Sequence, residues 1–203
     1  MNVVSFVIAA AALLACAREA QDDLRPARTM GSATAPVTIY EMSDFQCPWC
    51  GRFARETMPT LEREYVATGK VRIIFVNFPL PMHANAGPAA ELAMCAAKQG
   101  RFWPMHNLLF RTQDRWEGLR EPGVFFLGLG DSVGADRDQL TACVRTAATR
   151  DLVRVDAEGA ARSGARSTPT FWIEGGLMTG AQPIEVFRSV LDSIIRVKTR
   201  PAR

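Results

Sequence analysis

The residues of this chain best suited to chemistry are two cysteines separated by two positions, Cys47 and Cys50. Pro48 suits the first turn of a helix, where its missing N–H is not needed. Cys47 is therefore expected at a helix N-terminus, where unpaired N–H groups and the helix dipole favour a thiolate. Because a thiolate attacks disulfides and a second cysteine one turn away can resolve the mixed disulfide, the spacing predicts a redox site.

The flanking sequence supplies the strand and the helix that such a site needs. Residues 35–45 are apolar and β-branched, which is typical of a buried strand. Beyond the cysteines, four residues recur at helical spacing on one face: Phe53, Thr57, Leu61 and Tyr65. The cysteines are thus predicted at a strand-to-helix junction, and Pro59 is expected to kink the helix.

Other uses of a C-x-x-C pair fit this sequence less well. Gly51, not histidine, follows the pair, which excludes covalent haem attachment. The sequence has no second C-x-x-C, and His83 and His106 do not stand at zinc-ligand spacing from the first. We therefore expect no metal and no cofactor, and we expect both histidines at a helix start or on the surface.

Length and composition are those of a globular protein. The 203 residues are 48% hydrophobic and 22% charged, which suits one sizeable domain or one domain with an insertion. The net charge of +3 is spread along the chain without a basic run, so nucleic-acid binding is not expected.

The N-terminal residues predict export. Residues 3–15 form an apolar run of about 13 residues, shorter than the roughly 20 that span a bilayer but suited to a signal-peptide core. The small residues before Cys16 resemble the lipidation site of bacterial lipoproteins, although Leu14 is bulky for its position and no Lys or Arg precedes the core. We favour a signal peptide at 1–15 with lipidation of Cys16; the alternative is an ordinary export signal. Both permit disulfides.

Two further cysteines, Cys95 and Cys143, remain once Cys16 is set aside and Cys47 is paired with Cys50. They could form a structural bridge, or they could be buried free thiols that pack as small apolar residues. The bridge is favoured.

The sheet-forming segments come in two groups. Residues 71–78 read as a second buried strand, so the first helix crosses between two parallel strands. Strands at 168–173 and 177–180 and an amphipathic helix at 183–197 follow near the C-terminus.

A helical block separates these two groups. An alanine-rich helix is expected at 89–99, followed by another at 101–111, whereas the glycines of 121–130 leave that segment ambiguous. Asp136 is expected to open the next helix and Asp151 the one after it. The predicted domains are a linker at 16–34, a core at 35–82 and 165–203, and an inserted helical domain at 83–164.

Three motifs in this order resemble the DsbA-like thiol-disulfide oxidoreductases of the thioredoxin superfamily. They are YEMSDFQCPWC at 40–50, GRFWPMHNLLF at 100–110 and STPTF at 167–171. The match covers roughly residues 35–198 and implies an α/β, thioredoxin-like fold with an inserted helical domain.

The resemblance also implies roles for individual residues. It makes Cys47 the exposed nucleophile and Cys50 its buried partner. Thr168 and Pro169 match the cis-proline loop that lies against the disulfide and offers backbone groups to a substrate strand. Glu41 matches a buried acid that exchanges protons with the buried thiol; its alternative is a solvated residue on an edge strand.

The substrate surface and the second cysteine pair follow in the same way. Beside Pro48, we expect Trp49, Thr168 and Trp172 to line a shallow apolar groove for extended peptides, although each aromatic residue could also be core. Cys95 and Cys143 resemble the structural second pair of some family members. One difference is Trp49, because the strong oxidants of this family carry histidine there; without that imidazole we expect a less oxidising couple.

The leading hypothesis is a monomeric dithiol oxidase of the bacterial cell envelope, periplasmic or extracytoplasmic. It would act on cysteine-containing exported proteins and be reoxidised by a DsbB-like or equivalent membrane protein, touching the membrane itself only through a lipid on Cys16. The alternatives are an envelope reductase or isomerase and a non-catalytic peptide-binding holdase. A glutathione-dependent transferase is disfavoured because such sites generally lack paired cysteines.

Overall fold

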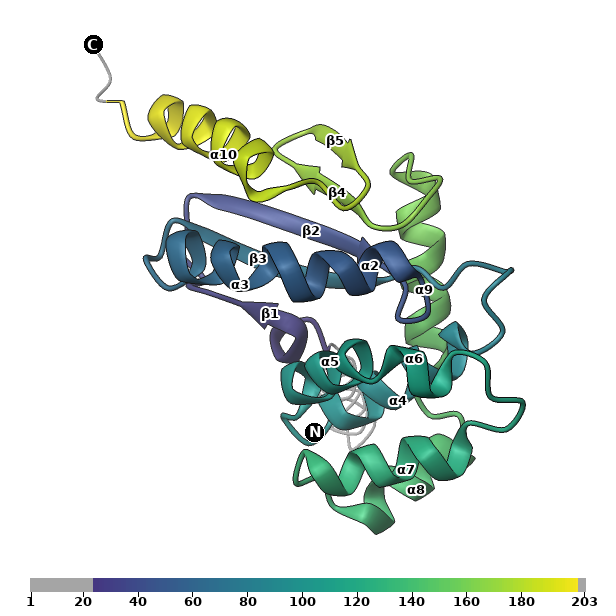
Figure 1. Ribbon diagram of the computed structural model, residues 1–203. Helices are drawn as coiled ribbons and strands as arrows, with labels where there is room; N and C mark the ends of the chain where they lie inside the picture. Colours follow the sequence, from purple (N-terminus) through teal and green to yellow (C-terminus); the bar gives the residue numbers. More distant parts are fainter. Residues whose placement is uncertain (1–23, 201–203) are drawn as a thin grey trace, which may run out of the picture.

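The computed structural model describes residues 24–200, which form a five-stranded sheet flanked by helices (Figure 1). The sheet order is β1-β3-β2-β4-β5, with β2 and β3 parallel and the other neighbours antiparallel. The strands are β1 Thr29–Met30, β2 Val37–Ser43, β3 Val71–Asn77, β4 Thr170–Ile173 and β5 Gly176–Thr179. This arrangement confirms the predicted α/β class and places β2 at the centre of the sheet.

A helical segment of changing pitch connects β2 to β3. Its parts are α2 Pro48–Arg52, the π-helical η2 Phe53–Thr57, α3 Met58–Leu61 and the π-helical η3 Glu62–Val66. Pro59 has no N–H to donate, and the wider turn lies directly before it, where the Met58 N–H reaches back to the Phe53 carbonyl. The proline that was expected to kink the helix therefore coincides with a change of pitch.

The two faces of the sheet pack against different helices. On one face, Phe171 of β4 packs with Phe53 and with α10 (Ile184–Lys198). On the other, Trp172 packs beside α9 (Arg150–Arg162). Neighbouring residues of a strand point to opposite faces, so Phe171 and Trp172 belong to different layers of the protein.

The helical insertion lies between β3 and β4. Its helices are α4 Ala86–Ala97, α5 Phe102–Arg111, α6 Gln113–Trp116, α7 Gly123–Ser132, α8 Arg137–Arg145 and α9. Helices α4 to α8 occupy the lower half of Figure 1, and α9 rises beside the sheet. The Asp136 carboxylate accepts the Gln139 N–H at 2.8 Å, which confirms the predicted N-cap of α8. The domain boundaries at residues 82 and 164 stay a prediction.

The structure settles the ambiguous segment at 121–130 and corrects the expected start of α9. The ambiguous glycine-rich segment is helix α7, because burial of Phe126 and Leu129 outweighs the low helix propensity of glycine. Asp151 does not cap α9, since the helix begins one residue earlier, after Thr149.

Cys95 of α4 and Cys143 of α8 are joined by a disulfide, with their Sγ atoms 2.03 Å apart. The bond ties together two helices that also pack against each other. The bridge favoured from the cysteine count is therefore present, and the free-thiol alternative is not.

The prediction of an unstructured linker through residue 34 is wrong for residues 26–30. Thr29 and Met30 form β1, and Arg28 beside them is buried. Arg28 donates to the Phe75 carbonyl at 2.7 Å and forms an ion pair with Asp156 of α9 at 2.6 Å. Residues 26–30 show no hydrophobic periodicity that would predict a strand. Their conformation is fixed by contacts with Phe75 and Asp156, which are distant in sequence.

The predicted signal peptide (1–15) and the lipidation site Cys16 lie outside the described residues. The same is true of the predicted linker up to residue 23. Within 24–200, no helix combines the length and the apolar character needed to cross a membrane.

Candidate functional site

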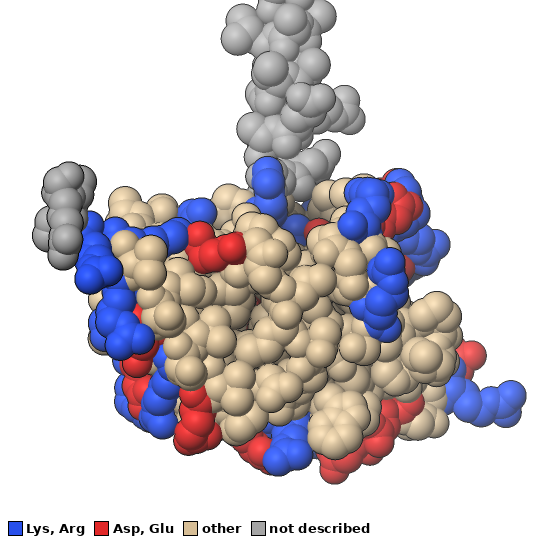
Figure 2. All heavy atoms as spheres, turned by 90° about the horizontal axis from the view of Figure 1, so that it is seen from above, with Lys and Arg blue, Asp and Glu red and all other residues tan. Residues whose placement is uncertain are grey.

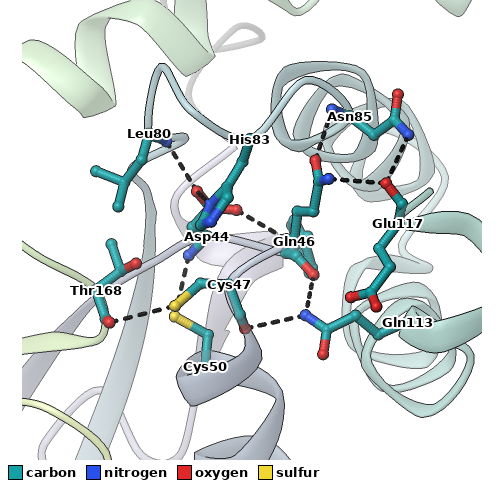
Figure 3. Close-up of polar contacts among 11 residues, drawn as sticks. Asp44, Gln46, Cys47, Cys50, Leu80, His83, Asn85, Gln113, Glu117 and Thr168 are labelled. Atoms are coloured by element: carbon teal, nitrogen blue, oxygen red, sulfur yellow. Dashed lines mark hydrogen bonds and ion pairs between the residues drawn. The ribbon is translucent and has the colours of Figure 1, made fainter. Parts of the chain in front are cut away.

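The cysteine pair lies at the junction of β2 and α2, as predicted, with Cys50 inside the first turn of the helix. Cys47 is the N-cap residue of α2, and Pro48 occupies its first turn. Both cysteines are free thiols, Cys50 fully buried and Cys47 only 4% exposed. The expectation of an exposed Cys47 is therefore wrong, because its sulfur lies beneath the loop of Thr168, whose carbonyl oxygen is 3.4 Å away (Figure 3).

The two thiols differ in acidity. A hydrogen bond from Cys50 is the largest cause that lowers the pKa of Cys47 to about 6; the Thr168 side chain and the N–H groups of Cys50 and Trp49 add to it, while burial opposes it. Burial raises the pKa of Cys50 well above its usual range, and the neighbouring Cys47 adds to this. At neutral pH, Cys47 is mostly thiolate and Cys50 stays protonated. The pair thus combines a nucleophile with a proton-bearing partner.

Thr168 and Pro169 stand where the resemblance placed them. The Thr168–Pro169 peptide bond is cis, and both residues are buried. The Pro169 carbonyl accepts the N–H of Gly180 at 2.8 Å, which fixes the loop to the end of β5. The structure therefore brings the loop of Thr168 directly against Cys47.

Glu41 is buried in the central strand and is not a solvated edge residue. It pairs with Phe75 of β3 and with Phe171 of β4, and it is 0% exposed. Neither carboxyl oxygen has a hydrogen-bond partner. Burial is the main cause that raises the pKa of Glu41 to about 8; Glu62 adds to the shift and Ser43 opposes it. At neutral pH the carboxyl is therefore largely protonated and can donate a proton.

Gln113 of α6 is a site residue that the sequence analysis missed. Its Nε2 donates to two backbone carbonyl oxygens of the strand-to-helix turn, that of Phe45 at 2.8 Å and that of Cys47 at 3.0 Å (Figure 3). A glutamine more than sixty residues away carries no local signal for such a contact. The insertion therefore holds the backbone on which Cys47 is mounted.

Replacing Gly51 by alanine is expected to loosen this clamp. A Cβ at Gly51 would overlap the Oε1 atom of Gln113, which cannot swing away without giving up its two hydrogen bonds. We expect Gly51→Ala to lower the free energy of unfolding by about 1–3 kcal/mol, measured by urea denaturation.

Gly128 supplies the matched control for that experiment. It is also helical, but it is exposed and a Cβ there would meet no atom within 4 Å. Gly128→Ala should therefore raise the free energy of unfolding by up to about 1 kcal/mol. Equal effects of the two variants would contradict a role for Gln113 in fixing the turn.

A second set of contacts missed from the sequence lies on the other side of the cysteines. Asp44, three residues before Cys47, contacts the half-buried His83. Gln46 accepts the N–H of Asn85 at 2.6 Å, and Asn85 in turn donates to backbone carbonyls at the end of α6 (Figure 3). The loop between β3 and α4 is therefore tied to the residues that precede the cysteine pair.

The expected groove is only partly assembled. Trp49 is 56% exposed beside Cys47, with the Arg52 guanidinium 5.9 Å from its ring centre. Trp172 does not join it, because its side chain lies on the opposite face of the sheet from Phe171. There it makes an edge contact with Tyr40 and lines a separate, mostly apolar hollow of about 390 Å³.

His106 corrects the expectation of a surface histidine. It is 1% exposed and lies in edge contact with Phe45, Phe75 and Phe110. Burial lowers its pKa to about 4, despite a hydrogen bond with Asn107 that acts in the other direction. Neutral at pH 7, it behaves as part of the aromatic core beneath the cysteines.

No group of three or more His, Cys, Asp or Glu side chains within residues 24–200 is arranged to hold a metal ion.

The chain is similar to a known protein family and to several known sequences and solved structures. A family model described as thioredoxin matches residues 24–193. The chain is 32% identical, over 84% of its length, to the Na(+)/H(+) antiporter NhaA 3 of Salinispora tropica and 33% identical, over 80%, to NhaA 1 of Salinispora arenicola. It spans only about a quarter of the length of these two relatives, 25% and 24%.

Other similar proteins match over most of their own length. The probable disulfide bond formation protein D of Bacillus anthracis is 27% identical over 74% of this chain and 70% of that protein. Among solved structures, Wolbachia pipientis alpha-DsbA1 has a TM-score of 0.75 at 23% identity, covering 84% of this chain and 92% of its own. Oxidised BdbD from Bacillus subtilis has a TM-score of 0.75 at 22% identity, covering 83% and 92%. These two structures show the same fold.

Proposed function

We propose that this chain, which belongs to the thioredoxin family, is a DsbA-like thiol-disulfide oxidoreductase that works as a dithiol oxidase on exported proteins. One observation carries the proposal. An acidic Cys47 at a helix N-terminus lies beside a Cys50 that stays protonated, which is the asymmetry that disulfide exchange requires.

The proposed reaction begins with the Cys47–Cys50 disulfide. A substrate thiolate attacks Cys47 Sγ, the bond between the cysteines breaks, and the Cys50 sulfur leaves with the electron pair and takes up a proton. A second substrate thiolate then attacks the substrate sulfur of the mixed disulfide and releases Cys47 as a thiolate. Two electrons pass from the substrate dithiol to the enzyme, and the low pKa of Cys47 favours its departure.

The surface around Cys47 suits a polypeptide substrate. The exposed Trp49 and Pro48 lie on one side of its sulfur, and the loop of Thr168 and Pro169 lies on the other. In Figure 2, which looks down on the side of α10 and β5, charged side chains gather along the margins and the centre is formed by other residues. An extended peptide would dock beside Trp49 and the loop of Thr168, with its own cysteine over Cys47 and without contact to Trp172.

The remaining parts of the proposal concern the cell. We place the chain in the bacterial envelope as a monomer, anchored through a lipid on Cys16 and reoxidised by a DsbB-like membrane protein. The support is the signal-peptide pattern in the sequence and the name of the Bacillus anthracis relative, a probable disulfide bond formation protein.

The competing proposal is an envelope reductase, which Trp49 favours because indole cannot stabilise the Cys47 thiolate as an imidazolium would. The equilibrium of the Cys47–Cys50 couple with glutathione separates the two, together with the redox state of the pair in cells. For an oxidase we expect the pair to be oxidised in cells and its potential to lie between those of thioredoxin, about −270 mV, and DsbA, about −120 mV. A pair held reduced in cells, with a potential at or below that of thioredoxin, would instead establish the reductase.

A further inference from the structure

Asp44 has a buried side chain and lies close in sequence to the cysteine pair. Its side chain is 0% exposed, and it accepts three hydrogen bonds. Two come from backbone N–H groups, Gln46 at 2.7 Å and Leu80 at 2.8 Å. The third comes from His83 Nδ1 at 2.7 Å. Among the contacts described for residues 24–200, His83 is the one ionisable side chain that pairs with this carboxylate.

The same aspartate contacts the sulfur chemistry through its backbone. The Asp44 N–H points at Cys50 Sγ from 3.4 Å, and the hydrogen bond favours the thiolate of Cys50 (Figure 3). The position of this N–H depends on the loop that the carboxylate braces. His83 is therefore linked to Cys50 Sγ through one residue, Asp44.

Two opposing effects follow from this geometry. A carboxylate on the residue whose N–H faces Cys50 Sγ is expected to disfavour a negative charge on sulfur, and so to disfavour the reduced, thiolate-bearing form. A donor on that carboxylate withdraws part of its charge and relieves the effect. Removing Asp44 and removing His83 should therefore move the redox equilibrium in opposite directions.

We infer that Asp44 and His83 form a positioning pair that sets the balance between the disulfide and the dithiol of Cys47 and Cys50. The inference rests on the proposed function and goes beyond it. Indole at position 49 offers no charge to the Cys47 thiolate, whereas this pair is connected to Cys50 Sγ through the Asp44 N–H.

The test is a double-mutant cycle read out as the equilibrium constant with glutathione. Asp44→Asn should shift the constant about tenfold toward the dithiol, and His83→Ala should shift it severalfold toward the disulfide. In the Asp44→Asn background, His83→Ala should have no further effect, because its target charge is gone. His83→Gln, which keeps a donor, should fall between the alanine variant and the unmodified protein.

The rate of alkylation of Cys47 as a function of pH gives a second readout. The midpoint should move down in Asp44→Asn and up in His83→Ala, since the same charge acts on the attacking sulfur. A role confined to folding would not move this midpoint.

Asp156→Asn is the matched control. Asp156 is another largely buried aspartate, and its ion pair with Arg28 lies in the sheet and α9, not at the cysteines. This variant should lose stability and leave the redox equilibrium unchanged.

Three results would overturn the inference: no shift in either single variant, shifts of the same sign, or an equal effect of His83→Ala in both backgrounds. Failure of the proposed function would look different. If Cys47 and Cys50 reached no equilibrium with glutathione in the unmodified protein, there would be no couple for the pair to adjust.

Discussion

Replacing Cys47 by serine abolishes oxidation of a dithiol peptide, with a loss of roughly 10³-fold or more. The reason is that serine cannot form the disulfide with Cys50 that the substrate thiolate attacks. Its hydroxyl also does not ionise near neutral pH, whereas hydrogen bonds lower the pKa of Cys47 to about 6 against the opposing effect of burial. The measurement is the initial rate of disulfide formation in a peptide carrying two cysteines, followed by loss of free thiols.

Replacing Cys50 by serine gives a different outcome and serves as the control. This variant cannot form the disulfide that oxidises a dithiol, but its Cys47 thiolate still attacks a disulfide-bonded peptide and displaces one of the two peptide sulfurs. Without Cys50 to resolve it, the resulting mixed disulfide accumulates and is visible as a heavier species on non-reducing gels. Equal rates for Cys47→Ser and the unmodified protein would exclude the reaction proposed above. Full function of the Cys47→Ser/Cys50→Ser double variant in cells would instead favour a peptide-binding holdase.

The parts of the site that the sequence could predict are those fixed by local pattern. Cys47 at the helix N-cap follows from a β-branched run, a C-x-x-C and a proline within a few residues. The parallel pairing of β2 with β3 follows from the strand-helix-strand order. The same pairing places Glu41 in the central strand, where it is buried between β3 and β4.

The parts that could not be predicted depend on contacts between distant residues. The hydrogen bond from Cys50, not the helix terminus alone, is the largest cause of the acidity of Cys47. Gln113 and His83 carry no local signal, because each contacts the segment around the cysteines from a separate element, Gln113 at the Cys47 carbonyl and His83 at Asp44. Trp172 was misplaced because a shift of one position along a strand moves a side chain to the other face.

The buried acid Glu41 provides the second large expected effect, on stability. Its carboxyl has a pKa of about 8 in the folded protein, against 4.5 for an ordinary glutamate, because burial penalises the charged form. Between pH 4.5 and pH 8 the folded state therefore binds a proton that the unfolded state has lost, and stability falls as pH rises through this window. A shift of this size corresponds to about 5 kcal/mol lost at and above pH 8, relative to acid pH.

We expect Glu41→Gln to remove this dependence. The variant should match the unmodified protein near pH 4 and should be more stable by up to about 5 kcal/mol at pH 9. Urea unfolding across this pH range measures it, with the Cys47–Cys50 disulfide formed so that neither thiol titrates. Glu56→Gln is the matched control, because Glu56 is exposed in an ion pair with Arg52 and should leave the pH profile nearly unchanged.

The same variant separates stability from catalysis. If the neutral carboxyl of Glu41 supplies the proton that Cys50 takes up as it leaves, Glu41→Gln should slow disulfide exchange by roughly 10²-fold while the folded state becomes more stable at neutral pH. Such opposite movements are the signature of a costly buried acid retained for its chemistry. A variant that gained stability and kept its full exchange rate would leave Glu41 without a part in the reaction and would assign proton delivery to water.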